Sequence, residues 1–339
     1  MIIRSNIVNA IGHSQQHAQG SLLLAANAPS FAISIVICTR NRAPKLRVTL
    51  EAIRRLEIPS GSSLELIIID NGSTDDTASV CAEYENVFLG RLHRVFVAEP
   101  GLGRARNVGL AHATGEIIAF TDDDILPKPD WLLVICREFA ADLNLSMISG
   151  RVELANPNDL PMSIRRRTDR TDFGLLGHSF SLFIGCNFAI RRELIDRIGQ
   201  FDPDFGAGAR FCSSEDSDFF YRAWKAGEKL SYVPSLFVHH DHGRRMPEDR
   251  TKLARNYILG RGAFYAKHAL RRDMTVIKEM YWELLKARRA LFDRHDELGW
   301  RYMIWMLRGI VGYGLLRLGR LVSLLLPGGF CLERCYWHL

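Results

Sequence analysis

Residues 116–125 have the sequence EIIAFTDDDI, in which a short apolar run ends directly in three adjacent aspartates. The run is rich in β-branched and aromatic side chains, which predicts a buried strand over 116–120. Comparable apolar runs occupy residues 33–38, 65–69 and 94–98, and helical spacing occupies residues 43–57, 75–85 and 103–113. Strands that alternate with helices at these intervals predict an α/β fold with a mostly parallel central sheet flanked by helices.

The three aspartates, Asp122, Asp123 and Asp124, follow this strand at its carboxyl end, where sheets of this class bind their ligands. Adjacent carboxylates repel one another, and a bound cation would offset that repulsion. Oxygen ligands suit Mg²⁺ or Mn²⁺, which proteins often hold with one or two carboxylates and the phosphates of a substrate. We therefore expect a divalent metal site here, with a solvated acidic turn as the alternative.

A glycine-rich segment, PGLGRARNVGL at 100–110, follows the third predicted strand and leads into a helix. Backbone N–H groups at such a helix start attract anions, and Arg104 and Arg106 would add charged donors for a phosphate. The segment lacks the GxGxxG spacing of dinucleotide-binding proteins. It predicts a phosphate site, and a simple tight turn is the alternative.

Three further polar segments carry candidate functional residues. Asp70 ends the second strand, where a buried carboxylate needs a partner, and the base or ribose of a nucleotide would supply one. Residues 213–218, SSEDSD, open a predicted helix, so their acids serve either as helix-start residues or as a general base. The segment HHDH at 239–242 follows a predicted strand and favours a nitrogen ligand to the metal.

The order of these segments resembles that of the family 2 glycosyltransferases, which have the Rossmann-like GT-A fold. The resemblance covers about residues 31–245 and rests on SIVICTRNR at 34–42, DNGSTD at 70–75, GLGRARN at 101–107, the acidic loop, GCNFAIR at 185–191, and Glu215 with Asp216. It implies an inverting, metal-dependent transfer from a nucleotide-diphosphate sugar to a hydroxyl acceptor, such as a glycan or lipid-linked saccharide in cell-surface polysaccharide synthesis. The Gln-x-x-Arg-Trp motif of the processive synthases is absent, which favours a single addition.

Carried over residue by residue, the resemblance implies three groups of site residues. The residues that match family positions at the nucleotide sugar are Thr39, Asp70, Arg106 and Asp122, and we expect Arg40, Gly103 and Asp123 beside them to contact it as well. The residues expected to bind Mn²⁺ or Mg²⁺ are Asp124, Asp122 and His240, with His239 and His242 as alternatives to His240. Asp216 matches the catalytic base of the family, and Glu215 is its neighbour on the acceptor side.

Basic charge is concentrated in the last third of the chain. Residues 250–339 contain 17 Lys and Arg and 7 Asp and Glu, a net charge of +10, whereas residues 1–249 carry 27 basic and 31 acidic residues, a net charge of −4. Helical spacing predicts three long helices at 249–270, 273–295 and 300–326. The sequence therefore predicts a basic helical extension after the α/β region.

The last predicted helix is apolar, but its sequence does not predict a membrane span. Its arginines Arg308, Arg317 and Arg320 interrupt the run of about 20 apolar residues that a span needs. We expect it to lie on an anionic membrane surface instead, with Trp305, Leu315 and Leu316 as inserting side chains. Packing on the catalytic domain or in a dimer is the alternative.

The expected organisation is a loosely ordered leader at 1–30, a catalytic domain at 31–248 and the helical extension at 249–339. The apolar patch in the leader, LLLAA at 22–26, is shorter than the roughly 7–15 residues of a signal peptide core. The seven cysteines form no CxxC pair, which suits a reducing compartment. We expect a cytoplasmic protein that is peripheral on the cytoplasmic face of the inner membrane.

Three other functions compete with this interpretation. The pI of about 9.0 suits nucleic-acid binding, but the acidic strand ends would repel a nucleic acid, so we expect no such partner. A nucleotidyl- or phosphoryl-transfer enzyme would need a P-loop or a comparable signature, which the sequence lacks. An inactive scaffold would not need Asp124 and Asp216, and both are present.

Overall fold

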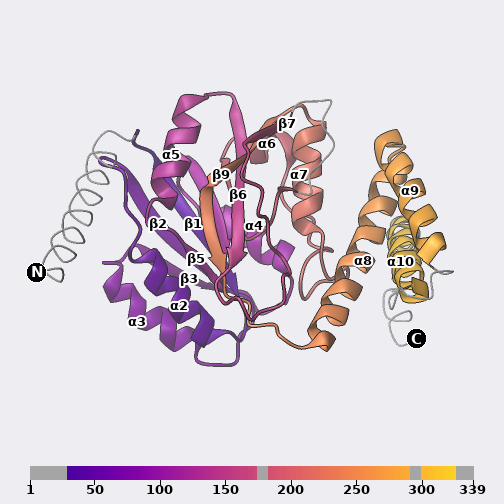
Figure 1. The fold of residues 1–339 in the computed structure, drawn as a ribbon, viewed down its shortest axis with the longest axis horizontal. Coiled ribbons are helices and arrows are strands. Elements are labelled where there is room, and N and C mark those ends of the chain that lie inside the picture. The colour runs from indigo at the N-terminus through magenta and orange to yellow at the C-terminus, as the bar shows by residue number, and fades with distance from the viewer. Residues whose placement is uncertain (1–28, 174–181, 291–298, 326–339) are drawn as a thin grey trace, which may run out of the picture. The chain divides into compact units, whose positions relative to one another are not determined.

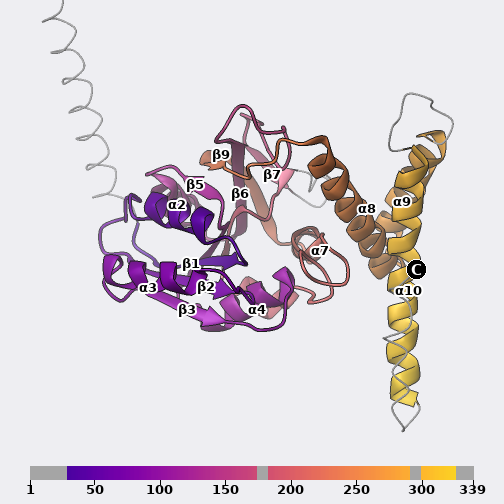
Figure 2. The ribbon, with the colours of Figure 1, turned by 90° about the horizontal axis from the view of Figure 1, so that it is seen from below.

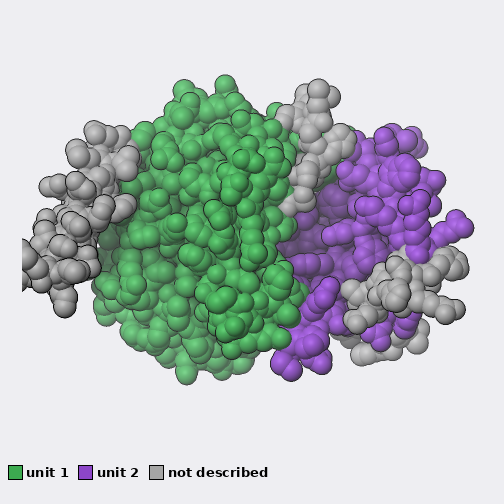
Figure 3. All heavy atoms as spheres, viewed as in Figure 1, with its two compact units in different colours: residues 1–100, 104–201, 219–245 green, residues 101–103, 202–218, 246–339 purple. Residues whose placement is uncertain are grey.

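The computed structural model describes residues 29–173, 182–290 and 299–325. It forms two compact units, which Figure 3 shows in different colours. Unit 1 consists of residues 1–100, 104–201 and 219–245, and unit 2 consists of residues 101–103, 202–218 and 246–339. The expected leader at 1–30 lies outside the described residues except for its last two. The sequence did not indicate that residues 202–218 belong with the C-terminal helices.

Among the described residues, unit 1 is built on a nine-stranded sheet in the order β3-β2-β1-β4-β8-β6-β9-β5, with β7 paired to β9. Figures 1 and 2 label all of these strands except β4 and β8. The strands are β1 Ala32–Thr39, β2 Ser63–Asp70, β3 Leu92–Phe96, β4 Ile117–Asp122, β5 Ile125–Pro127, β6 Leu145–Leu154, β7 Thr171–Phe173, β8 Asn187–Arg191 and β9 Lys229–His240. The helices of unit 1 are α2 Ala43–Ile53, α3 Thr77–Val87, α4 Leu102–His112, α5 Trp131–Ala141, α6 Leu194–Ile198 and α7 Glu215–Lys225. The first residues of α4 and α7, 102–103 and 215–218, belong to unit 2. The predicted α/β fold is confirmed.

The sheet is parallel where strands alternate with helices and mixed elsewhere. Strands β3, β2, β1 and β4 pair in parallel, as do β6 and β9. Strand β8 runs antiparallel to β4 and β6, and β5 and β7 run antiparallel to β9. The parallel arrangement predicted from the sequence therefore applies mainly to the first half of the sheet.

The register of the parallel strands aligns the polar residues at their ends. Thr39 of β1 is paired with Asp70 of β2, and Cys38 is paired with Asp122 of β4. Strand β3 begins at Leu92, two residues before the predicted 94–98, because the polar His93 masks its start in the sequence. The carboxyl ends of β1, β2 and β4 thus form one polar edge, where ligands bind in sheets of this class.

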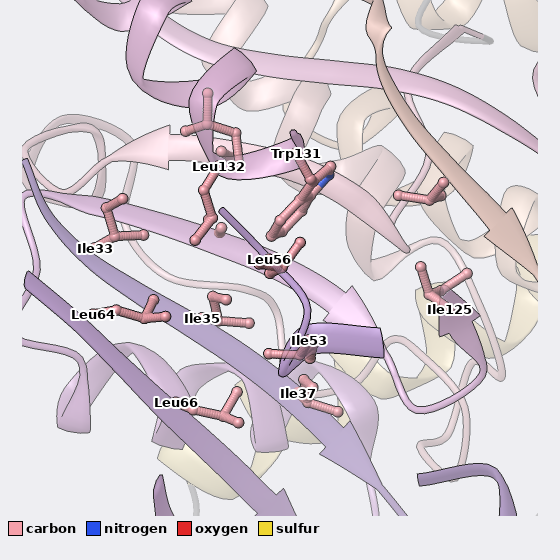
Figure 4. Packing of buried hydrophobic residues seen from close by; sticks show 14 of the residues in the cluster. Ile33, Ile35, Ile37, Ile53, Leu56, Leu64, Leu66, Ile125, Trp131 and Leu132 are labelled. Atoms are coloured by element: carbon pink, nitrogen blue, oxygen red, sulfur yellow. The ribbon is translucent and has the colours of Figure 1, made fainter. Parts of the chain in front are cut away.

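The main core of unit 1 lies on one face of β1, where Ile33, Ile35 and Ile37 point to the same side (Figure 4). They pack with residues of α2 and with the fully buried Trp131 at the start of α5. Helix α4 covers the other face so closely that a Cβ on Gly109 would lie 2.4 Å from Val36 Cγ1. Burial on both faces explains the continuous apolar sequence of this strand.

Unit 2 contains the helices α8 Pro247–Ala269, α9 Met274–Ala290 and α10 Gly299–Leu325. Helices α8 and α10 cross at glycines: a Cβ on Gly262 would lie 2.3 Å from Met306 O, and one on Gly309 would lie 2.1 Å from Leu259 O. Only glycine permits this approach of the two backbones. Among the described helices, none has both the length and the apolar composition that crossing a bilayer requires.

Candidate active site

The acidic loop connects β4 to β5 at the polar edge of unit 1. Asp122 is the last residue of β4, and its side chain is 32% exposed. Asp123 and Asp124 occupy the turn that follows and are buried. Three adjacent carboxylates therefore differ in exposure, and the two buried ones need charged or hydrogen-bonding partners.

Arg42 is the main cationic partner of the two buried aspartates. Its Nη1 lies 3.0 Å from Asp123 Oδ1, and its Nη2 lies 2.6 Å from Asp124 Oδ2. The side chain is one-third exposed, so it reaches the acids from the solvent side. The sequence alone indicated no role for Arg42, although the residue lies within the segment SIVICTRNR.

The loop that carries Arg42 is fixed by the segment DNGSTD. Asn41 has a positive φ of 52°, and its backbone N–H donates to Ser73 Oγ at 3.0 Å. The backbone N–H groups of Ala43 and Thr77 donate to the two carboxylate oxygens of Asp75, at 3.0 and 3.1 Å. Asp75 therefore joins the starts of α2 and α3, and one role of this segment is to position Arg42.

Asp123 points into the protein. Thr39 Oγ1 donates to its Oδ2 at 2.7 Å, and Thr49 Oγ1 donates to its carbonyl oxygen at 2.8 Å. Burial raises the pKa of Asp123 to about 7, although the charge of Arg42 acts in the opposite direction. Thr39 and Asp123, both expected to contact the nucleotide, thus bind each other.

His240 is the histidine that reaches the acidic loop. Strand β9 pairs it with Ile125, the residue after Asp124, and its Nε2 lies 3.3 Å from Asp124 Oδ1. Of the two alternatives, His239 packs against the ring of Phe237 at 4.7 Å, and His242 Nε2 lies 3.1 Å from Leu160 O.

The protonation of Asp124 and His240 follows from their contact. Burial would raise the pKa of Asp124, but His240 and Arg42 outweigh it and hold that pKa below its usual range. Burial would lower the pKa of His240, but the hydrogen bond and charge of Asp124 raise it above its ordinary value. Arg42 and His240 therefore both favour the ionised form of Asp124.

These residues fit a divalent cation whose coordination is completed by substrate. The Nδ1 of His240 lies 3.2 Å from Ser163 O, and a carbonyl only accepts, so Nδ1 carries a proton and Nε2 is directed to Asp124. A backbone carbonyl on the second ring nitrogen is the usual arrangement of a metal-binding histidine. Among the described residues no group of three or more His, Cys, Asp and Glu side chains forms a ready metal site, so substrate phosphates would supply further ligands.

Arg106 supports Asp122 from inside the protein. The side chain is 3% exposed, its Nη2 donates to Gly185 O at 2.8 Å and lies 3.5 Å from Asp122 Oδ1. Its guanidinium lies 5.8 Å from the ring centroid of Phe188 and 5.6 Å from that of Phe201. The glycine-rich segment was expected to present this arginine to a phosphate, and here the arginine stabilises the end of β4.

Asp70 has a protein partner that the sequence did not indicate. Arg94 of β3 donates to its Oδ2 from Nε at 3.0 Å and from Nη2 at 2.5 Å, and the Ser73 N–H donates to its Oδ1 at 2.9 Å. The partner expected for this carboxylate was the base or ribose of a nucleotide. Arg40, also expected at the nucleotide, is exposed directly after β1.

The other expected site residues belong to unit 2. A Cβ on Gly103 would lie 2.7 Å from Asp202 O, so a close backbone approach explains the glycine. Glu215 and Asp216 form the first turn of α7. Glu215 is buried beside Gly206, and the Asp216 carboxylate is partly exposed and accepts the Ser217 N–H at 2.7 Å.

Comparison with known structures identifies the fold. The mannosyltransferase PcManGT from Pyrobaculum calidifontis, solved in complex with GDP-Man and Mn²⁺, aligns with a TM-score of 0.57 at 19% identity, over 93% of this chain and 91% of that one. At this identity the likeness shows the fold alone, which is the GT-A fold that the resemblance implied.

Relatives with curated names agree with this fold. The pre-mycofactocin glycosyltransferase of Mycobacterium tuberculosis is 28% identical over 314 residues, which are 87% of this chain and 56% of that protein. The succinoglycan biosynthesis protein ExoM of Rhizobium meliloti is 25% identical over 224 residues, which are 66% of this chain and 69% of that protein. The chain thus spans little more than half the length of the mycobacterial relative.

Two family models match the sequence. The model described as glycosyl transferase family 2 matches residues 34–199, and the one described as glycosyl transferase family group 2 matches residues 117–331. The second match includes the acidic loop, Glu215, Asp216 and His240 and extends over more than half of the chain. The chain therefore belongs to the family 2 glycosyltransferases.

Proposed function

We propose that this chain transfers one sugar residue, with inversion, from a nucleotide-diphosphate sugar to a hydroxyl group of a glycan or lipid-linked acceptor. The observation that carries the proposal is the contact of Asp124 with Arg42 and His240 at the carboxyl edge of the sheet. Two cationic groups there compensate a carboxylate that a divalent cation could also bind, and the diphosphate of the donor would bind to that cation. The relatives' names, which include succinoglycan biosynthesis, support an acceptor in polysaccharide synthesis.

The donor end of the reaction is assigned to unit 1. Asp124 and His240 would hold the divalent cation with Asp122, which Arg106 keeps in place from the buried side. When bound, the cation would offset the negative charge that develops on the departing diphosphate. The complex of the Pyrobaculum mannosyltransferase with GDP-Man and Mn²⁺ supports both a nucleotide sugar and a metal for this fold.

The acceptor end is assigned to Asp216, with Glu215 beside it. The hydroxyl group of an acceptor has a pKa far above neutral, so its attack needs a base. Asp216 accepts the hydroxyl proton while the acceptor oxygen bonds to the anomeric carbon and the bond from that carbon to the diphosphate breaks. Its partly exposed carboxylate at the start of α7 supports this role.

Turnover of a panel of nucleotide sugars tests the proposal. We expect nucleotide release that depends on Mn²⁺ or Mg²⁺, disappears in excess EDTA and returns when the metal is restored. Asp124→Ala should abolish turnover without loss of fold. Asp241→Ala is the matched control, because Asp241 adjoins His240 but pairs with Lys45. Full activity in excess EDTA would contradict the metal-dependent mechanism.

We further propose that unit 2 attaches the enzyme to an anionic membrane surface. Exposed apolar side chains recur every three or four residues along α10, at Trp300, Ile304, Leu307, Val311, Leu315 and Leu318. This apolar stripe of α10 lies on one side of the helix, and exposed arginines adjoin it at Arg301, Arg308 and Arg317. The net charge of +10 over residues 250–339 is complementary to anionic lipid headgroups.

The stripe differs from the inserting residues expected from the sequence. Trp305 and Leu316 are buried, and only Leu315 of the three expected residues is exposed. The buried pair lies on the opposite side of α10 from the stripe, because a helix turns by about 100° per residue. The membrane proposal therefore rests on the stripe.

Sedimentation with vesicles tests the membrane proposal. We expect binding to vesicles of phosphatidylglycerol and phosphatidylcholine, little binding to phosphatidylcholine alone, and a decrease as salt rises. Val311→Glu with Leu315→Glu should remove the salt-resistant part, whereas Leu143→Glu, an exposed position of unit 1, should not. A protein that ignores anionic vesicles but loses a dimer in the double variant would show that the stripe is an interface between two copies.

A further inference from the structure

Unit 2 contains a buried ionic cluster that the proposed reaction does not use. Lys267, whose side chain is 4% exposed, places Nζ 2.7 Å from Asp202 Oδ2 and 2.7 Å from Asp218 Oδ1. The Nε2 of His268 lies 2.9 Å from the same oxygen of Asp218, which is fully buried. We refer to these four residues as the lysine cluster. Buried charges are costly unless they are paired, so the arrangement needs a reason.

The lysine cluster joins the last turn of α8 to the first turn of α7. Lys267 and His268 lie at the end of α8, where basic side chains interact favourably with the helix dipole, and Asp218 lies at the start of α7, where acids do. Asp218 follows Asp216 by two residues. Its carboxylate, held from two sides, therefore restrains the turn that carries the proposed base.

A second contact holds the chain just before that turn. Ser213 Oγ donates to Asn256 O of α8 at 2.9 Å, and a Cβ on Gly260 would lie 2.1 Å from the same Oγ. Ser214, with a positive φ of 73°, accepts the Asp218 N–H on its carbonyl oxygen at 2.9 Å. Helix α8 thus contacts the segment on both sides of Glu215 and Asp216.

We infer that Lys267 and His268 are positioning residues, which hold Asp218 and so orient the carboxylate of Asp216 toward the acceptor hydroxyl. The inference rests on the proposed role of Asp216 as the base. It assigns to helix α8 a part in the reaction that is separate from the membrane attachment proposed for α10. The effect on catalysis is indirect, because neither residue touches the reacting atoms.

The test compares Lys267→Met in two backgrounds. In the otherwise unchanged enzyme, we expect kcat to fall about 10²-fold, the loss that a misplacement of about 1 Å can cause. The dissociation constant of the donor nucleotide, measured by calorimetry with Mn²⁺, should stay nearly unchanged, since Asp122, Asp124 and His240, which are assigned to the donor and its metal, belong to unit 1. In an Asp216→Asn background the same substitution should lower the residual kcat no further, because the base it orients is gone.

Three controls keep the inference falsifiable. Arg261→Met removes another ion pair of α8, that with Glu283 of α9, and should leave kcat unchanged. If Lys267→Met does not fold, Asp218→Asn, which keeps the side-chain volume, takes its place in the same comparison. Circular dichroism and the melting temperature establish that each variant is folded at the assay temperature.

The possible outcomes separate this inference from the proposed function. Wild-type kcat in folded Lys267→Met, with an inactive Asp216→Asn, would overturn the positioning role alone. An equal loss in both backgrounds would show a merely structural role and would also overturn it. Wild-type turnover in Asp216→Asn would contradict the base assignment itself, and the inference would fall with it.

Discussion

The two units each contain a small group of carboxylates compensated by a long basic side chain and a histidine, and the two groups differ in exposure. In unit 1, Asp123 and Asp124 face Arg42 and His240, and Arg42 is 33% exposed. In unit 2, Asp202 and Asp218 face Lys267 and His268, and Lys267 is 4% exposed. The same chemistry therefore occurs once beside solvent and once almost enclosed.

This difference indicates different roles. A partly exposed guanidinium can be replaced at the carboxylate by a divalent cation, which would in turn bind the diphosphate of the donor. An enclosed ammonium cannot be replaced by a cation from solvent, and removal of one partner leaves an uncompensated buried charge. The unit 1 group is thus suited to binding a charged ligand, and the lysine cluster is suited to holding a turn of the chain.

The largest expected effect is a loss of kcat in Asp216→Asn, which distinguishes the proposed base from the residues that bind the donor. Asp216→Asn should lower kcat by about 10²–10⁴-fold and leave the affinity for the donor nucleotide nearly unchanged. Steady-state kinetics with calorimetric binding would measure both quantities. Loss of nucleotide affinity with normal turnover at saturation would instead assign Asp216 to the donor and remove the division of roles between the units.

An intermediate effect is expected at His240. His240→Asn removes a proposed direct ligand, so it should weaken Mn²⁺ binding by at least the roughly 10–100-fold that loss of an outer-shell partner costs, and excess metal should largely restore turnover. His239→Asn is the comparison, because His239 packs against the ring of Phe237 rather than reaching the acidic loop. Metal titration of activity is the measurement, and an equal response of both variants would exclude His240 as the particular ligand.

The smallest expected effect concerns stability. Arg42→Met should lower the free energy of unfolding by about 1–2 kcal/mol, less than for a fully buried pair, because the guanidinium is partly solvated. Mn²⁺ should raise the melting temperature of this variant more than that of the unchanged protein, because Arg42 no longer competes for Asp124. Thermal melts of Lys267→Met with and without Mn²⁺ should show no such extra gain, and an equal gain would show that exposure does not distinguish the two groups.

The sequence was sufficient to predict the polar edge of unit 1. Short apolar runs identify the strands, and parallel strands bring the residues after them to one edge, so Thr39, Asp70 and Asp122 could be grouped from their positions alone. The basic charge of the last third of the chain and its long helices could also be predicted from the sequence. These features depend on local pattern or on the direction of a strand.

The partners of those residues could not be predicted, because they depend on register and on contacts distant in sequence. Arg94 reaches Asp70 through the β2–β3 pairing, and Arg42 reaches the acidic loop because two other segments fix its own loop. Residues two apart in a strand face the same side, so the sequence pattern cannot tell which of His240 and His242 lies beside the acidic loop. The pairing of His240 with Ile125 of β5 identifies His240 as that residue.

The lysine cluster could not be predicted from the sequence either, because its members are distant in the chain. Asp218 and Lys267 are 49 positions apart, and each has an ordinary local explanation, a first-turn acid and a last-turn base. The sequence therefore gave no reason to pair them. A signal that sequence reasoning could have used is the pair of charged residues Lys267 and His268 beside the apolar run AFYA, which is unusual for a solvated helix end.

The central claim is that Asp124 binds the metal–nucleotide complex, and calorimetry of nucleoside diphosphate binding tests it most directly. The unchanged protein should bind the nucleotide with Mn²⁺ and much more weakly with EDTA, whereas Asp124→Asn should bind weakly in both conditions and remain folded. Asp241→Asn, the matched control, should behave as the unchanged protein does. Equal, Mn²⁺-dependent affinity in Asp124→Asn and the unchanged protein would contradict the account.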